Sequence, residues 1–176
     1  MNPAQQAILG ARVFRVRELN AQIARLKEEN SDLREKVALF ESHFALAVLA
    51  ARDFASADGA YYVVDGWNLV LGAHRLAASS AELVAKTRVF LDVHAGAFAW
   101  IVFDGGRAAS NLDGRMRVSY TGGIGPQRAD RLILDFVRMA GLSGESGRIC
   151  VVTRDRKLAS EAVRLGASAS GELPVA

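Results

Sequence analysis

The chain has 176 residues, 51% of them hydrophobic, with a net charge of +3 and a pI of about 9.3. This length fits one ordinary α/β domain with an appendage, and the mildly basic balance is compatible with nucleic acid without being diagnostic of it. The single cysteine, Cys150, excludes an internal disulfide, and the Cys and His spacing offers no zinc site. No signal peptide or membrane span is indicated, so we expect a cytoplasmic protein without membrane contact.

The first third of the chain has the pattern of a coiled-coil helix. From Leu9 to about Ala51 there is no proline, and the only glycine is Gly10. Heptad positions a and d are occupied by Val16, Leu19, Ile23, Leu26, Asn30, Leu33, Val37, Phe40, Phe44 and Ala47. Alternating steps of three and four over four heptads indicate a coiled coil rather than a plain amphipathic helix.

The heptad pattern also predicts a second helix of the same sequence as partner. Asn30 is the one polar residue among the a positions, where a buried Asn fixes the register and favours a parallel dimer. We therefore expect a parallel homodimer through residues 9–51, with contacts from Ile23, Leu26, Asn30, Leu33 and Val37. A long helix packed on its own domain would use the same apolar positions but leave Asn30 unexplained, and a heterologous partner for the coiled coil stays open.

Residues 51–60 are small, polar and acidic, with a turn signal at Asp58-Gly59. We place the domain boundary there, which gives a coiled-coil dimerisation helix over 1–55 and a second domain over 56–176.

The second domain alternates short β-branched or aromatic runs with helical stretches. Strands are predicted at 61–64, 99–103, 116–120 and 148–153, and helices near 80–94, 128–140 and 156–165. The stretches after 64 as far as Gly72, from 105 to 114 and from 121 to 126 are predicted as loops, and the tail after Gly166 as a short edge strand. This alternation predicts an α/β fold with a doubly wound, mainly parallel sheet flanked by helices.

Four aspartates stand where a strand ends or a helix begins: Asp65, Asp104, Asp130 and Asp155. Sites form outside the carboxyl ends of parallel strands, and carboxylates gathered there repel unless protons or cations intervene. Hard divalent cations prefer oxygen ligands, so the pattern indicates a metal site. Each residue also has a plain alternative, because Asp before Gly is common in turns and Asp130 and Asp155 are placed to cap helices.

The motifs together resemble a known family. D-G-x-N at 65–68, V-F-D-G at 102–105, Ala129-Asp130 and V-V-T-x-D-R at 151–156 resemble the NYN domains, and more narrowly the YacP-like branch of the PIN-like nucleases, over about 61–174. The resemblance implies a PIN-like fold and a ribonuclease that uses Mg²⁺ or Mn²⁺. It implies catalytic roles for Asp65, Asn68, Asp104, Asp130 and Asp155, with the four aspartates as metal ligands. One departure is Arg131, which stands where the family often has a second acid.

A metal held by these carboxylates could activate water for attack on a phosphodiester, so we expect an endoribonuclease acting on single-stranded RNA. Thr153 could hydrogen-bond a ligand carboxylate. Candidate RNA-binding residues are Trp67, Arg107, Arg115, Arg117, Arg128 and Arg131. Solvated loop arginines and a packed Trp67 are the alternatives. Arg131 also motivates a second hypothesis, a catalytically weak or inactive RNA-binding scaffold of the same fold, and a ribosome or other protein partner is left open.

Overall fold

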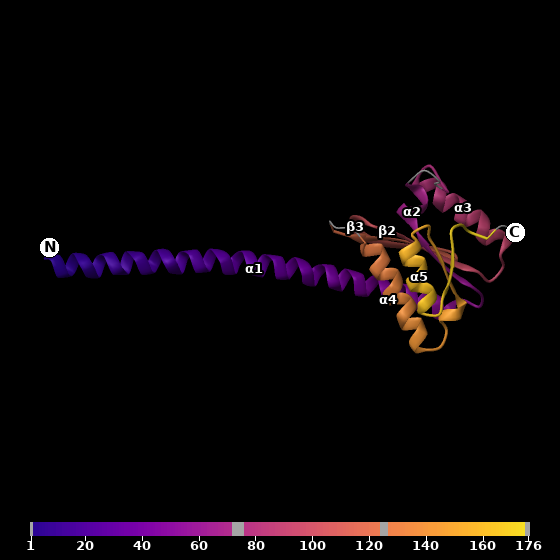
Figure 1. Cartoon of the computed structure of the whole chain (residues 1–176). Coiled ribbons are helices and arrows are strands. Elements are labelled where there is room, and N and C mark those ends of the chain that lie inside the picture. The colour runs from indigo at the N-terminus through magenta and orange to yellow at the C-terminus, as the bar shows by residue number, and fades with distance from the viewer. Residues whose placement is uncertain (1, 72–75, 124–126, 175–176) are drawn as a thin grey trace. The chain divides into compact units, whose positions relative to one another are not determined.

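The computed structural model describes residues 2–71, 76–123 and 127–174 (Figure 1). The chain divides into two compact units, Met1–Phe40 and Glu41–Ala176. The predicted loop at 121–126 lies partly outside the described residues, as does the stretch around Gly72. None of the described helices combines the length and apolar character needed to cross a membrane.

The long N-terminal helix is present as α1 (Pro3–Ser56). Its last part belongs to the second unit, because Leu46, Ala47, Ala50 and Phe54 are buried in the core of that unit. These apolar residues recur at steps of one, three and four, so they form a stripe that packs against the sheet. The second unit therefore begins at Glu41, earlier than the boundary at 55/56 suggested by the sequence, and Ala47 is buried in its own domain instead of extending the heptad pattern.

A six-stranded, mostly parallel sheet forms the centre of the second unit, which confirms the α/β class. Its strands are β1 (Tyr61–Asp65), β2 (Phe98–Phe103), β3 (Gly105–Asp113), β4 (Met116–Gly122), β5 (Ile149–Val152) and β6 (Ser168–Ser170). They lie in the order β3-β4-β2-β1-β5-β6, and only β3 is antiparallel to its neighbour. The hydrophobic runs that predicted the parallel strands are buried in this sheet, as expected for strands covered on both faces.

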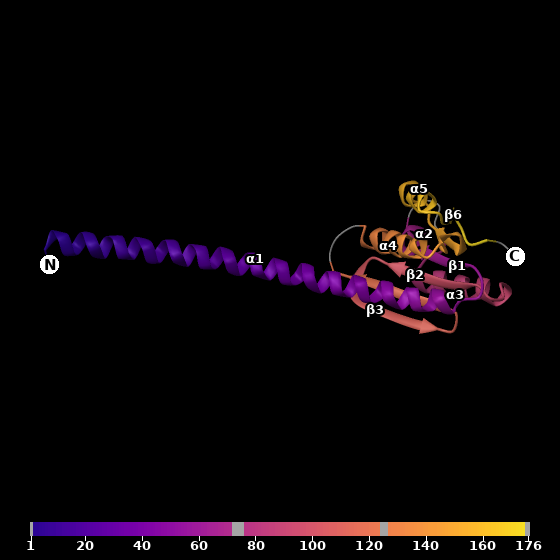
Figure 2. The same cartoon turned by 90° about the horizontal axis from the view of Figure 1, so that it is seen from below.

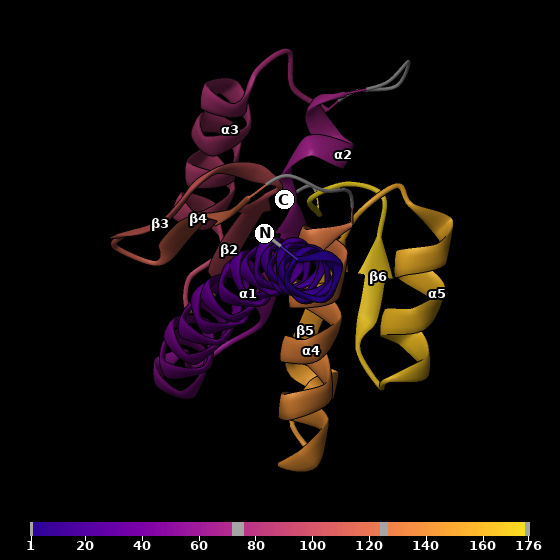
Figure 3. The ribbon, with the colours of Figure 1, turned by 90° about the vertical axis from the view of Figure 1, so that its left-hand side faces the viewer.

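Helices cover both faces of the sheet (Figures 2 and 3). The helices are α2 (Gly66–Val70), α3 (Ser80–Val93), α4 (Arg128–Leu142) and α5 (Arg156–Arg164), with a 3₁₀ turn at Ser146–Arg148. The end of α1 shares one hydrophobic cluster with α4 and α5, and α2 and α3 share the other. Odd-numbered residues of β1 and β5, such as Val63 and Val151, face the first cluster, while Val64 and Val152 face the second.

Two segments differ from the loops predicted for them. Residues 105–113 form the edge strand β3, and residues 66–70 form the short helix α2. The β3 sequence is polar and largely exposed, so its own pattern carries no strand signal. Its pairing with β4 supplies the hydrogen bonds, with a register irregularity between Gly105 and Ala109.

An aromatic cluster ties α1 to the sheet. Phe54 meets Tyr61 edge-on at 5.4 Å between ring centroids and Phe136 of α4 at 5.7 Å. Trp100 of β2 is fully buried and meets Phe136 at 5.3 Å. Aromatic pairs of this geometry add to the energy of apolar burial, so the end of α1 is an integral part of the domain core.

The strand order places a topological switch point between β1 and β5. The chain leaves β1 through α2 and α3 towards β2, and leaves β5 through α5 towards β6, on opposite sides. Crevices outside the carboxyl ends of strands form where connections diverge in this way. Asp65 and the segment from Thr153 to Asp155 lie at this position.

Candidate metal centre

Asp65 is held at the carboxyl end of β1. It is 6% exposed, and its Oδ2 accepts a hydrogen bond of 2.8 Å from the hydroxyl of Thr153, just after β5. The same hydroxyl oxygen accepts a bond of 3.1 Å from the backbone N–H of Asp155. The hydrogen bond predicted for Thr153 is therefore present, and it joins the two strands at the switch point. Asp65 ends a strand and precedes a helix, so the turn alternative does not describe it.

Asp104 follows β2 and is fixed by two other segments. Its Oδ1 accepts the backbone N–H of Ala129 in the first turn of α4 at 2.5 Å, and lies 3.3 Å from the Thr121 hydroxyl. Its backbone carbonyl accepts a bond of 2.8 Å from the indole Nε1 of Trp67. An N–H in the first turn of a helix has no partner within that helix, so this carboxylate caps α4 from outside.

Asp130 and Asp155 occupy different positions in their helices. Asp155 is the N-cap of α5, and its side chain accepts the backbone N–H groups of Lys157 and Leu158. Asp130 lies inside the first turn of α4, whose N-cap is Gln127 with φ of 63°. The capping alternative therefore describes Asp155 and does not describe Asp130.

Electrostatics couple the four aspartates. Burial raises the pKa of Asp65 to about 6, with further increases from Asp130 and Asp104, while Thr153 and the backbone of Asn68 act in the opposite direction. Burial also raises the pKa of Asp130, with contributions from Asp155 and Asp104, and Lys157 opposes the rise. The Asp65 carboxyl group is therefore close enough to those of Asp104 and Asp130 to be affected by their charges, and the Asp130 carboxyl group is likewise affected by those of Asp104 and Asp155.

The donor set suits a hard divalent cation, because carboxylate oxygens are its preferred ligands. In the residues 2–71, 76–123 and 127–174, however, no three acidic, His or Cys side chains form a ready-made ligand group. Mg²⁺ keeps several waters and binds proteins through one or two carboxylates, so the arrangement fits a hydrated ion better than an all-protein cage.

Asn68 links α2 to the loop after β5. Its Oδ1 accepts the backbone N–H of Arg154 at 2.6 Å, so the carbonyl end of the amide is committed to the scaffold. Trp67 is also engaged, since its ring packs on Phe103 at 4.9 Å between centroids in addition to its bond with Asp104. Trp67 is thus packed beneath the site, which is the alternative considered for it.

Three of the five candidate arginines are placed outside the scaffold contacts described below. Arg107 is exposed on β3, and Arg128 and Arg131 lie in the first turn of α4. Burial lowers the pKa of His43 on α1, Asp135 opposes this, and Arg131 and Arg128 add to the lowering. These two arginines are therefore close enough to His43 to affect its charge. Arg128 also lies 3.4 Å from the carbonyl oxygen of Thr121.

The prediction that Arg115 and Arg117 border the site is wrong. Arg117 is 5% exposed and forms a bidentate ion pair with the buried Asp53 of α1. Arg115 donates to the carbonyl oxygens of Leu91, His94 and Ala97 around the end of α3, before β4 begins. Both are committed to the scaffold near the amino end of β4, away from the acidic edge.

Two features of the site had no strong signal in the sequence. Lys157 in the first turn of α5 is the cation that lowers the pKa of Asp130, and nothing in its spacing indicated this role. Gly66 follows Asp65 because a Cβ there would lie 2.4 Å from the ring of Phe103. The glycine of the D-G-x-N motif therefore allows α2 to pack closely against β2.

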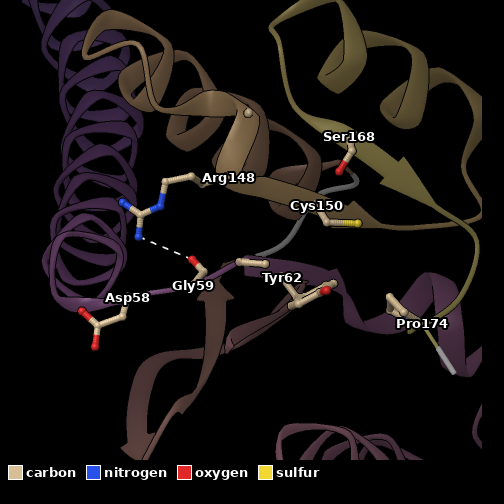
Figure 4. Close-up of a pocket in the computed structure, with 9 residues that line it drawn as sticks. Asp58, Gly59, Tyr62, Arg148, Cys150, Ser168 and Pro174 are labelled. Atoms are coloured by element: carbon tan, nitrogen blue, oxygen red, sulfur yellow. Dashed lines mark hydrogen bonds between the residues drawn. The ribbon is translucent and has the colours of Figure 1, made fainter. Parts of the chain in front are cut away.

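A separate groove lies at the opposite edge of the sheet (Figure 4). It has a volume of about 590 Å³ and is lined by Asp58, Gly59, Ala60, Tyr62, Gly147, Arg148, Cys150, Ser168 and Pro174. Cys150 is half-buried, and this burial raises the pKa of its thiol. Apart from Pro174, these residues precede their strands or lie at their amino ends, so the groove is distinct from the acidic edge.

The fold and the site define a three-layer α/β domain with carboxylates gathered at its topological switch point. Comparison with protein-family models, with curated proteins and with solved structures found no match.

Proposed function

We propose that this protein is a ribonuclease dependent on Mg²⁺ or Mn²⁺, with its reaction centre at the carboxyl ends of β1, β2 and β5. The observation that supports this most is the raised pKa of Asp65, caused by burial and by the neighbouring Asp130 and Asp104. A buried carboxylate with like charges nearby is costly without a cation, and perturbed carboxyl groups concentrate at functional sites. The four ordered motifs that resemble the NYN domains point to the same chemistry.

In this proposal Asp65, Asp104, Asp130 and Asp155 hold the ion, directly or through water. When bound, the ion supplies a water of lowered pKa and balances charge on the phosphoryl oxygens. Thr153 orients Asp65 through its 2.8 Å hydrogen bond, and the capping bonds of Asp104 and Asp155 fix those carboxylates against α4 and α5. Preorganised groups of this kind need little rearrangement during reaction.

The substrate backbone would meet cationic and amide groups from α2, α4 and α5. The Oδ1 of Asn68 accepts the backbone N–H of Arg154, so in this proposal its NH₂ group is the end that donates to a phosphate oxygen. Arg128 is half-buried, and among the described residues its Nε has no hydrogen-bond partner. A buried donor without a partner is costly, and a phosphate would supply the acceptor. Lys157 and Arg131 are the other two cationic side chains proposed to contact the substrate backbone. RNA is favoured over DNA by the motif resemblance.

The test is cleavage of single-stranded RNA by the full chain with Mn²⁺ or Mg²⁺, with single-stranded DNA of the same sequence in parallel. We expect Asp65→Asn to lower the rate about 100-fold or more, because preorganised charge at the reaction centre contributes on that scale. Asp92→Asn, an exposed change on α3, is the matched control. Equal rates for wild type and Asp65→Asn, or loss of activity in the control, would refute the proposal.

A second function is favoured by one observation. The Asp155 carboxylate is already used to cap α5, and the described residues contain no ready ligand group. The same fold could then bind RNA without cutting it. Calorimetric titration with Mg²⁺ and Mn²⁺ separates the two, since RNA binding without metal binding or cleavage supports the scaffold.

A further inference from the structure

Helix α1 carries an exposed apolar stripe from Val16 to Phe44. The side chains at heptad positions a and d from Val16 to Phe44 are between 41% and 71% exposed, apart from the polar Asn30: Val16, Leu19, Ile23, Leu26, Leu33, Val37, Phe40 and Phe44. Exposed apolar stripes of this length on a helix cost solvation free energy and mark an interaction surface. A stripe repeating every 3.5 residues fits another helix of the same repeat.

Asn30 restricts which helix fits. It lies within the stripe at an a position and is exposed with its neighbours. In a parallel, in-register pair Asn30 meets its own copy, and the two amides can hydrogen-bond. In an antiparallel pair, or a shifted register, it would face an apolar side chain and lose that bond.

The flanking charges agree with the same arrangement. Glu29 at position g would face Arg34 at position e of the partner helix, and Lys36 would face Glu41. Within one chain Glu29 pairs with Arg25 and Lys36 with Asp32, one turn away. All four side chains of these two pairs are at least half exposed, so exchange of partners costs little.

The structure also defines where the stripe ends. Phe44 at position a is 59% exposed, whereas Ala47 at the next d position is 4% exposed and packs into the core of its own domain. One helix face cannot pack against both a partner helix and its own sheet. The interface therefore stops near Phe44 and does not extend to residue 51.

We propose that two copies of this chain associate through a parallel, in-register coiled coil that spans Val16 to Phe44, with Asn30 selecting the register and the two-stranded state. This inference is independent of the nuclease proposal, because none of the residues that it uses belongs to the acidic edge.

The test is disulfide crosslinking of the full chain in a Cys150→Ser background, beside sedimentation at tens of micromolar. Leu19→Cys at a d position should crosslink rapidly to its own copy in a parallel pair. In an antiparallel pair, where a positions lie opposite d positions and Asn30 faces Leu33, it would face Phe44 instead. The control is Ala21→Cys, on the outer face of the same turn. A monomer in sedimentation, or equal crosslinking at both positions, would overturn the proposal.

The substitution Asn30→Ile tests whether Asn30 determines the number of helices in the coiled coil. With an Ile at this position we expect a mixture of dimers and larger oligomers. Retention of a strict dimer would refute the role given to Asn30. Leu26→Glu combined with Leu33→Glu should give a monomer, and unchanged near-ultraviolet circular dichroism from Trp67 and Trp100 would show that the α/β domain remains folded.

Discussion

Replacement of Asp65 by Asn should stabilise the metal-free protein at neutral pH. The carboxyl group is 6% exposed and its pKa is raised from 3.8 to about 6, chiefly by burial. Its charged form is therefore disfavoured in the folded state. An Asn side chain fills nearly the same space, can still accept the Thr153 hydrogen bond, and carries no charge. The expected gain has the opposite sign to the usual effect of changing a buried polar residue.

The sign and size follow from proton linkage. Between pH 3.8 and about 6 the folded chain keeps the Asp65 proton and the unfolded chain releases it. The stabilisation is complete below 3.8 and is lost as the pH rises through 6. A shift of about two pKa units corresponds to at most about 3 kcal/mol. For a chain of this length, 1 kcal/mol moves Tm by about 2–4 °C, so Asp65→Asn should raise Tm by up to about 10 °C at neutral pH.

The assay is thermal unfolding in a chelator, with wild type, Asp65→Asn and Asp92→Asn compared from about pH 4 to about pH 7.5. Wild type and Asp92→Asn should lose stability across this range more steeply than Asp65→Asn. Addition of Mg²⁺ or Mn²⁺ at ten times its Kd should restore about 1.4 kcal/mol to wild type, and much less to Asp65→Asn. Parallel pH curves for wild type and Asp65→Asn would refute the reasoning.

Other changes test the scaffold. Asp53→Ala should cost about 3–5 kcal/mol in urea unfolding, because it leaves Arg117 buried without its partner. Asp53→Leu combined with Arg117→Met should cost less than Asp53→Ala, and a cost at least as large would contradict the ion-pair argument. Gly66→Ala should cost about 1–3 kcal/mol, because its Cβ would overlap the ring of Phe103. Gly147→Ala, with no atom within 4 Å of its Cβ, is the matched control and should have little effect.

Much of the fold could be predicted because the local patterns agree with the final structure. The runs Tyr61–Val64 and Trp100–Phe103 are buried strands, and the helical stretch after Asp130 packs its apolar side on the sheet. The position of Asp65 at a strand end likewise placed it at the acidic edge. In each case a few neighbouring residues carry the whole signal.

The misplaced features depend on contacts between distant residues. Arg115 and Arg117 lie in sequence between Asp104 and Asp130, which suggested a common loop. However, the antiparallel strand β3 runs back along the sheet and leaves both arginines at the amino end of β4, away from the acidic edge. The partner of Arg117 is Asp53, 64 positions earlier in the chain. Residues 105–113 form a strand only because β4 lies beside them. Local sequence patterns do not reveal contacts between residues that are far apart in the chain.

The burial of Leu46, Ala50 and Phe54 limits where the chain can be cleaved or recombined without damage to the α/β domain. A protease or a recombination event that cut at residue 56 would remove part of the core and leave an aromatic-lined gap on the sheet. A cut near residue 40 would separate the two units and leave each one whole. The carboxyl-terminal part of α1 therefore cannot be exchanged independently of the α/β domain. Any transfer of this domain to another protein must include the last four turns of α1.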